Sequence, residues 1–171
     1  MARSIVLAFL LLMLPVQAAR ADDPFFDGLA GSWNGSGFVR LVANAQEENI
    51  RCRLSTVANP NGKELGVVGN CVMASFMLPV TGSIIALGGS KYTSTVFASL
   101  ANLTTSNFSG RARGSALQLN FRGKDAQSGQ TINSTLTIRK RGKGRFDVSI
   151  KRTDPQSGAL FDVGVIAFKG G

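Results

Sequence analysis

The stretch TINSTLTIRKRGKGRFDVSIKR, residues 131–152, contains two runs of alternating apolar and polar residues, separated by a short basic segment with two glycines. Leu136 and Ile138 lie on one face of the first run, and Phe146 and Val148 on one face of the second. Successive side chains of a β-strand point to opposite faces, so each run predicts a strand with one buried and one wet face. Together they predict an antiparallel β-hairpin over a core.

The same alternation recurs along most of the chain, at short intervals broken by Gly, Asn, Ser and Pro, while helical periodicity is almost absent after residue 22. Strands are expected over residues 32–42, 48–57, 64–73, 75–81 or a little beyond, 92–100, 107–113, 116–123, 131–140, 145–152 and 160–168. So many strands with short connections predict an all-β protein whose sheet leaves no long open edge. We expect a single antiparallel up-and-down β-barrel of 8–10 strands, with a β-sandwich as the alternative.

The first 21 residues have the pattern of a secretory signal peptide. Arg3 provides a positive charge, residues 5–16 are apolar, and Ala19 and Ala21 form a small-x-small cleavage site. The apolar run is too short for a transmembrane anchor. We expect residues 1–21 to be removed, which leaves a β-barrel domain over residues 22–171 without a membrane anchor, in the bacterial periplasm or secreted.

Two cysteines, Cys52 and Cys71, lie in the exported part. A disulfide between them is expected in an oxidising compartment and would stabilise the fold by roughly 3 kcal/mol. The turn between the strands leaves two registers open. A two-residue Asn61-Gly62 turn would place the cysteines directly opposite each other, whereas a type I turn with Pro60 in second position would shift the register by one.

The residue types argue against catalysis and metal binding. The chain has no histidine and only two cysteines, so the commonest general base and the usual zinc ligands are missing. Asp147 and Asp162 lie on the polar faces of their expected strands. The sequence therefore predicts a protein that is not an enzyme, with no catalytic residues, metal or cofactor.

The apolar faces would shape the inside of the barrel. The candidate residues for a small apolar ligand there are Trp33, Phe121, Leu136, Phe146 and Val148. The most apolar stretch, residues 76–80 and 84–87, has three interpretations: a strand buried on both sides, a lid over the barrel, or the lining of a pocket.

Five cations within seven residues form a basic hairpin tip: Arg139, Lys140, Arg141, Lys143 and Arg145. Such a cluster predicts binding to an anionic component of the cell envelope, with a solvated basic loop as the plain alternative. Nucleic acid is not favoured as a partner, because Phe146 is the only aromatic residue close to the cations.

The pattern L-x-G-x-W, formed by Leu29, Gly31 and Trp33, resembles the first strand of lipocalins and avidins. In those eight-stranded barrels this tryptophan packs at one end of the barrel. The resemblance therefore implies a structural role for Trp33.

The chain also resembles two groups of exported bacterial proteins. Periplasmic inhibitors of metalloproteases are small barrels with one disulfide, and their extended N-terminal inhibitory segment would correspond to residues 22–26. Uncharacterised exported proteins share the pattern of residues 31–37 and 50–53. We expect an exported, non-enzymatic barrel that binds a small apolar ligand. The alternatives are an envelope interaction protein that uses the basic hairpin, or a protease inhibitor.

Overall fold

The computed structural model describes residues 23–40, 42–74, 76–98, 107–124 and 129–171. The expected signal peptide and the end of the strand expected at 92–100 lie outside these ranges. Among the residues described, no helix has the length and hydropathy needed to cross a membrane.

Each of the ten predicted strands is present. Their bounds are β1 Gly31–Val39, β2 Glu48–Ala58, β3 Glu64–Val72, β4 Met77–Gly88, β5 Lys91–Ala98, β6 Asn107–Arg113, β7 Ala116–Lys124, β8 Thr131–Lys140, β9 Arg145–Thr153 and β10 Leu160–Gly170. Most predicted boundaries hold within a few residues. The largest difference is β4, which runs well past the expected end at residue 81.

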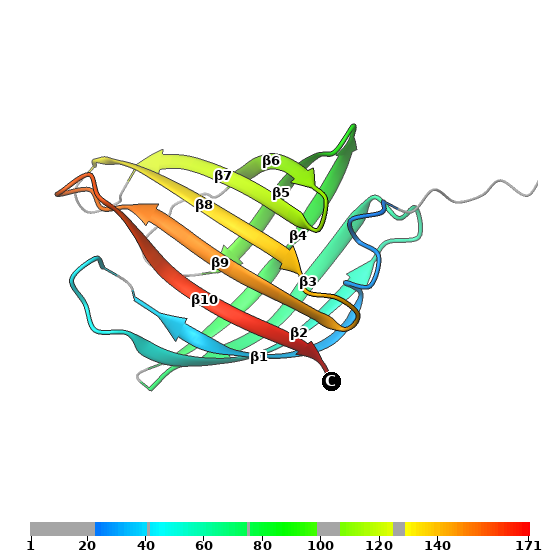
Figure 1. Cartoon of the computed structure of the whole chain (residues 1–171), viewed down its shortest axis with the longest axis horizontal. Coiled ribbons are helices and arrows are strands. Elements are labelled where there is room, and N and C mark those ends of the chain that lie inside the picture. Colours follow the sequence, from blue (N-terminus) through cyan, green and yellow to red (C-terminus); the bar gives the residue numbers. More distant parts are fainter. Residues whose placement is uncertain (1–22, 41, 75, 99–106, 125–128) are drawn as a thin grey trace, which may run out of the picture.

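The strands form a closed barrel in which every neighbour pair is antiparallel (Figure 1). Each strand pairs with the next along the chain, and β1 closes the ring by pairing with β10 from Trp33↔Gly170 to Val39↔Gly164. Closure satisfies the backbone groups that an open sheet would leave exposed at its edges. The predicted up-and-down barrel is confirmed, and the alternative of a β-sandwich is wrong.

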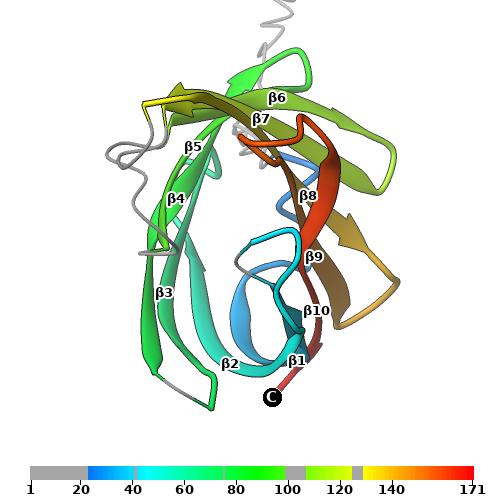
Figure 2. The ribbon, with the colours of Figure 1, turned by 90° about the vertical axis from the view of Figure 1, so that its left-hand side faces the viewer.

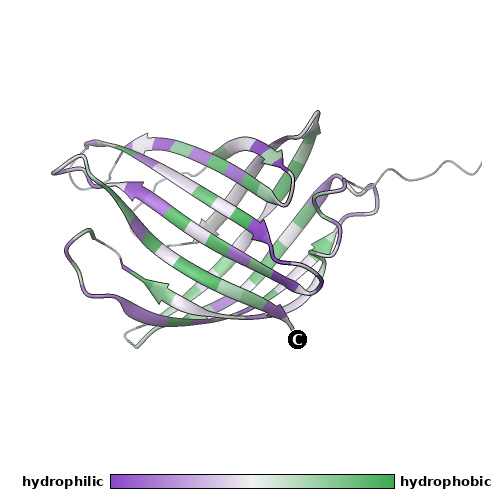
Figure 3. Ribbon diagram, viewed as in Figure 1, coloured by the Kyte–Doolittle hydropathy of each residue, from purple (hydrophilic) through white to green (hydrophobic). Residues whose placement is uncertain are grey.

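The alternation seen in the sequence separates the inside of the barrel from the outside (Figure 3). In β7, for example, Leu117, Leu119 and Phe121 are buried, whereas Gln118 and Asn120 are exposed. One continuous hydrophobic cluster lies in the interior and takes residues from every strand.

Cys52 and Cys71 form a disulfide, as predicted, and lie directly opposite each other in the β2–β3 ladder. The turn combines features of both alternatives. Gly62 N–H donates to the Asn59 carbonyl (2.9 Å) and Gly62 has φ +66°, which fits a type I turn through Pro60. Because Asn59 N–H also donates to the Glu64 carbonyl (2.9 Å), the loop holds one more residue and the cysteines stay in register.

Apart from Phe76, the apolar stretch at residues 76–80 and 84–87 belongs to the single long strand β4 and is not a lid. Leu78 and Ile84 point into the core, whereas Met77 and Leu87 are more than 60% exposed on the outer face. Burial on both faces is therefore wrong, and pocket lining is the interpretation that fits the inward residues.

Candidate ligand-binding cavity

On the β5–β7 side of the barrel, large apolar side chains among the described residues pack closely together. Leu117 and Leu119 have no exposed surface, and the rings of Phe108 and Phe121 lie 5.4 Å apart. Close packing of this kind leaves little room between these four side chains. Phe121, one of the predicted ligand-binding residues, therefore belongs to the packed core.

An apolar cavity of about 130 Å³ lies in the interior of the barrel. Its lining comes from two groups of strands, β2–β4 and β8–β10, which lie on opposite sides of the ring in Figure 2. One wall is formed by β2, β3 and β4, which contribute Ile50, Leu54, Leu65, Val67, Leu78, Val80 and Ile84. The other is formed by β8, β9 and β10, which contribute Leu136, Ile138, Val148, Ile150 and Ile166. Leu29, Phe146 and Phe168 also line the space.

Thr56 is the single polar residue in this lining, and its hydroxyl is engaged within the protein. The Oγ1 atom donates to the Leu29 carbonyl and accepts a hydrogen bond from Trp33 Nε1 at 2.9 Å. Because a ligand would meet no free donor or acceptor from the lining side chains, the cavity favours uncharged apolar molecules.

Trp33 lies at one end of the barrel and does not line the cavity. Its indole Nε1 also lies 3.2 Å from the Leu29 carbonyl oxygen, and its ring meets Phe146 edge-on with 4.8 Å between centroids. Phe146 in turn stacks on Phe168 at 4.8 Å. Trp33 thus has the structural position that the resemblance to lipocalins and avidins implies.

A short N-terminal segment, residues 23–29, closes the barrel at this end. Phe25, Phe26 and Leu29 are buried, and both phenylalanine rings pack edge-on against Tyr92 at 5.8 Å. The segment forms consecutive turns, not the extended inhibitory arm that the resemblance to protease inhibitors implies for residues 22–26. Its apolar side chains are consequently turned into the protein.

Tyr92 ties the barrel wall to this segment. Its hydroxyl donates a hydrogen bond of 2.6 Å to Asp23 Oδ1. Burial of the phenol raises its pKa above the ordinary value, and the hydrogen bond to the Asp23 carboxylate raises it further. The contact therefore stays intact throughout the physiological pH range.

Lys140 holds the same segment from the β8 side. Its Nζ donates to the carbonyl oxygens of Pro24 (3.2 Å), Phe25 (3.2 Å) and Asp27 (3.3 Å), and it lies 5.3 Å from the centre of the Phe25 ring. An ammonium has three donors, so these bonds use its full hydrogen-bonding capacity. Lys140 is therefore a structural residue, although the sequence placed it in an anion-binding cluster.

The other cations of the basic hairpin remain near solvent. Arg141 forms an ion pair with Asp147, which lowers the charge that the hairpin presents. Arg139, Lys143 and Arg145 are exposed. Of the five predicted anion-binding residues, these three are therefore exposed and are not used in the contacts described for Lys140 and Arg141.

Three of the five predicted ligand-binding residues, Leu136, Phe146 and Val148, line the cavity. The sequence did not indicate that β2 and β3 line a cavity, although pocket lining was one interpretation of the β4 residues Leu78, Val80 and Ile84. The signal for the β2 lining was present in the alternation of Ile50 and Leu54. The alternation could not show that β2–β4 face β8–β10 across unfilled space.

Among the residues described, no group of three or more His, Cys, Asp or Glu side chains lies together in a way that could hold a metal ion. The acidic residues singled out in the sequence are also apart from the cavity. Asp147 forms an ion pair with Arg141. Asp162 Oδ1 lies 3.5 Å from Lys151 Nζ on the outer surface.

The fold and the cavity together define a ten-stranded antiparallel β-barrel with an apolar interior space. No family model matches the chain, and no curated protein matches it. Among solved structures, the barrel is similar to the crystal structure of Rv2717c from M. tuberculosis, with a TM-score of 0.62. The match covers 88% of this chain and 99% of that chain at 12% sequence identity, a likeness of fold alone.

Proposed function

We propose that this protein is an exported, non-enzymatic barrel that binds a small, uncharged apolar ligand. The observation that carries the proposal is the cavity between the two walls, whose one polar side chain, Thr56, is already hydrogen-bonded inside the protein. An apolar cavity offers water no hydrogen-bond partners, so it stays dry and can bind apolar molecules. Burial of the guest's apolar surface then supplies the binding free energy.

The volume of the cavity limits the size of the ligand. At about 130 Å³ the space is smaller than the roughly 300–1,000 Å³ typical of sites for drug-sized molecules. It is close to the engineered cavity of about 150 Å³ that binds benzene or xenon. A single aromatic ring or a short alkyl chain is therefore the size class that fits.

Export is the second part of the proposal. The disulfide between Cys52 and Cys71 supports it, because such bonds persist in oxidising compartments. A signal-like N-terminus agrees with this location.

The alternative functions receive less support from the geometry. Lys140 and Arg141 are engaged within the protein, which weakens the basic hairpin as an anion-binding surface. Phe25 and Phe26 are buried, which weakens residues 22–26 as a protease-inhibiting arm. Neither observation weakens the support that the cavity gives to ligand binding.

Titration with benzene as a probe tests the binding site directly. We expect benzene to shift the NMR methyl signals of Ile84 and Ile150, which line opposite walls. Val148→Phe, which fills the cavity, should abolish these shifts, whereas Val68→Phe on the exposed outer face should leave them unchanged. Thermal unfolding would show that both variants fold. Failure of the wild-type protein to bind, or equal binding by Val148→Phe, would contradict the proposal.

The natural ligand can be sought by native mass spectrometry of the protein isolated from its own envelope fraction. The proposal predicts a bound small apolar molecule that is released on unfolding and absent from Val148→Phe. A ligand-free spectrum across several preparations would count against a resident ligand.

A further inference from the structure

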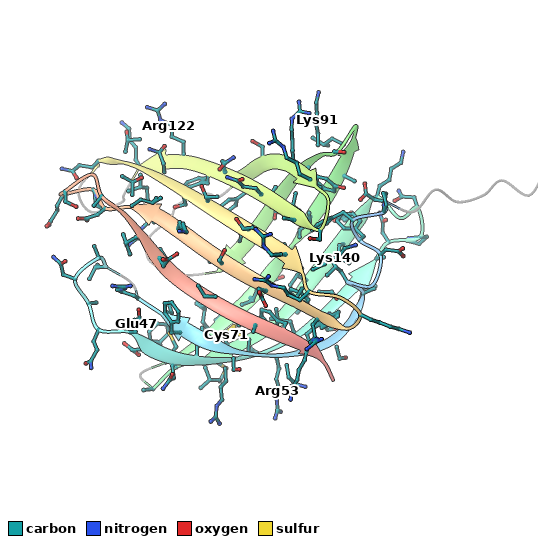
Figure 4. The ribbon with its side chains drawn as sticks, viewed as in Figure 1. Glu47, Arg53, Cys71, Lys91, Arg122 and Lys140 are labelled. Carbon is teal, nitrogen blue, oxygen red and sulfur yellow. A yellow bond between two sulfur atoms is a disulfide. The ribbon has the colours of Figure 1, made fainter. Side chains whose placement is uncertain are left out.

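The outer surface of the barrel carries a groove of about 500 Å³ over β10, β1, β2 and β3. Its side chains include three cations and three neutral polar groups: Arg51, Arg53, Lys169, Asn34, Asn70 and Ser36. Figure 4 shows Arg53 pointing away from the barrel below β1 and β2. This groove lies on the opposite side of the wall from the ligand cavity and was not predicted from the sequence.

The strand register explains how the cations come together. Asn34 pairs with Arg53 on one side and with Lys169 on the other, so these residues form a row across β2, β1 and β10. Arg51 lies two residues before Arg53 and therefore on the same outer face. None of the described residues that line the groove is acidic, whereas Glu48 and Glu47 lie in two adjoining hollows.

Exposed apolar side chains border this groove at the β3–β4 hairpin. Val72 pairs with Arg51 in the β2–β3 ladder and with Met77 in the β3–β4 ladder. Val72 is 52% exposed, Met77 63% and Phe76 39%. Contiguous exposed apolar residues next to charges are typical of interaction surfaces.

We propose that these six residues, Arg51, Arg53, Lys169, Val72, Phe76 and Met77, form a docking surface for an anionic lipid bilayer. Arginine and lysine are attracted to the negative potential of anionic lipids, and exposed apolar side chains insert at the headgroup boundary. The surface combines both elements on neighbouring strands. A soluble polyanion would use the cations and leave the apolar residues in water.

Docking to a bilayer would serve ligand transfer, and this role rests on the proposed ligand binding. Met77 is followed by Leu78, which points inward and lines the ligand cavity. A barrel seated on the bilayer through this hairpin would bring the cavity next to a store of apolar molecules. The docking surface would therefore allow the ligand to pass between the membrane and the barrel.

Co-sedimentation with lipid vesicles tests the docking surface. The full barrel should bind vesicles of phosphatidylglycerol and phosphatidylcholine but not of phosphatidylcholine alone, and high salt should weaken binding. Arg51→Ser with Arg53→Ser should lower vesicle affinity by about 25-fold, since each cation near an anionic bilayer contributes roughly fivefold. Phe76→Ser with Met77→Ser should lower it at both low and high salt, because this contribution is not electrostatic.

The matched control is Arg139→Ser with Lys143→Ser, which removes the same charge from the hairpin at the other end of the barrel. We expect it to change vesicle affinity by less than about twofold. Equal loss in this control, absence of wild-type binding, or full displacement of the protein from vesicles by soluble polyphosphate would overturn the proposal.

A benzene titration without vesicles separates the two proposals. The docking variants should bind benzene as the wild-type protein does, because their side chains lie outside the cavity. If the wild-type protein binds vesicles but not benzene, the ligand proposal fails and docking stands. If it binds benzene but not anionic vesicles, docking fails and the ligand proposal stands.

Discussion

Trp33 connects the N-terminal turn to the wall of the barrel. Its indole nitrogen lies within hydrogen-bonding distance of the Leu29 carbonyl and of Thr56. The L-x-G-x-W pattern was sufficient to predict a structural position for this residue. The contact with Thr56 was not predictable, because the two residues are 23 positions apart and meet only through the register of β1 and β2.

Lys140 offers the clearest test of a polar contact at the residue scale. Lys140→Met keeps the length of the side chain but removes three charge-assisted hydrogen bonds to the N-terminal segment. We expect the free energy of unfolding to fall by about 2 kcal/mol, measured by urea denaturation. Lys143→Met on the exposed hairpin tip should change it by less than about 0.5 kcal/mol. Equal effects of the two substitutions would show that Lys140 does not hold the N-terminal segment through these hydrogen bonds.

Tyr92 predicts a dependence of stability on alkaline pH. Its folded pKa is raised above the ordinary value of 10.0, first by burial and then by Asp23. The folded protein thus keeps a proton that the unfolded chain loses above pH 10, so the stabilisation is complete below that pH and is lost as pH rises further. Urea denaturation should show the stability advantage over Tyr92→Phe shrinking above pH 10.

Spectroscopy gives an independent measure of the same group, because Tyr92 is the only tyrosine in the chain. The phenolate absorbance of the folded protein should stay low at pH values where a free tyrosine ionises. Ionisation of the folded protein near pH 10 would show that Tyr92 is neither buried nor bonded to Asp23.

At the scale of strands and hairpins, alternation in the sequence was sufficient to place all ten strands. Boundaries were less certain where a strand contains unusual residues, as in β4. Pro79 and Gly82 interrupt its pattern, and the prediction ended the strand too early. On the β3 side Pro79 is tolerated because hydrogen-bonded pairs alternate along an antiparallel ladder. Met73 N–H donates to the Phe76 carbonyl, so the Asn70↔Pro79 pair falls at a position that needs no amide hydrogen from Pro79.

The β1–β10 seam depends on close packing over a glycine. A Cβ atom at Gly35 would lie 2.4 Å from the ring of Phe168, whereas one at Gly37 would lie 1.9 Å from the Val165 backbone carbonyl oxygen. Gly35→Ala should lower the free energy of unfolding by about 2 kcal/mol. Phe168→Leu should relieve most of that loss, because the clash is with a side chain.

Gly37→Ala is the matched control for this seam. Its clash involves the backbone of β10, so Phe168→Leu should give no relief. A double-mutant cycle on chemical denaturation measures both couplings. Additive effects of Gly35→Ala and Phe168→Leu would show that β1 and β10 do not pack as described.

For the whole molecule, the order of strands and the buried faces followed from the sequence, but the cavity did not. Alternation identifies which residues point inward without showing whether they fill the space between opposite walls. Leu119 and Leu136 both point inward and pair across β7 and β8, yet only Leu136 lines the cavity. Their difference arises from packing between strands that are distant in the sequence.

Charge distribution was also visible only in the folded molecule. The dense cationic run at residues 139–145 was obvious in the sequence, but part of it serves the N-terminal segment and Asp147. The outer groove contains Arg53 and Lys169, which are far apart in the sequence. Closure of the barrel through β1 brings them together, so a local pattern could not indicate this surface.

Diffraction from a crystal pressurised with xenon tests the central proposal that the interior of the barrel holds a dry apolar cavity. We predict one strong xenon peak between Leu54 and Ile150, inside the space of about 130 Å³. The peak should be absent from Val148→Phe. Ordered water at this position, or side chains that fill it without room for xenon, would contradict the account.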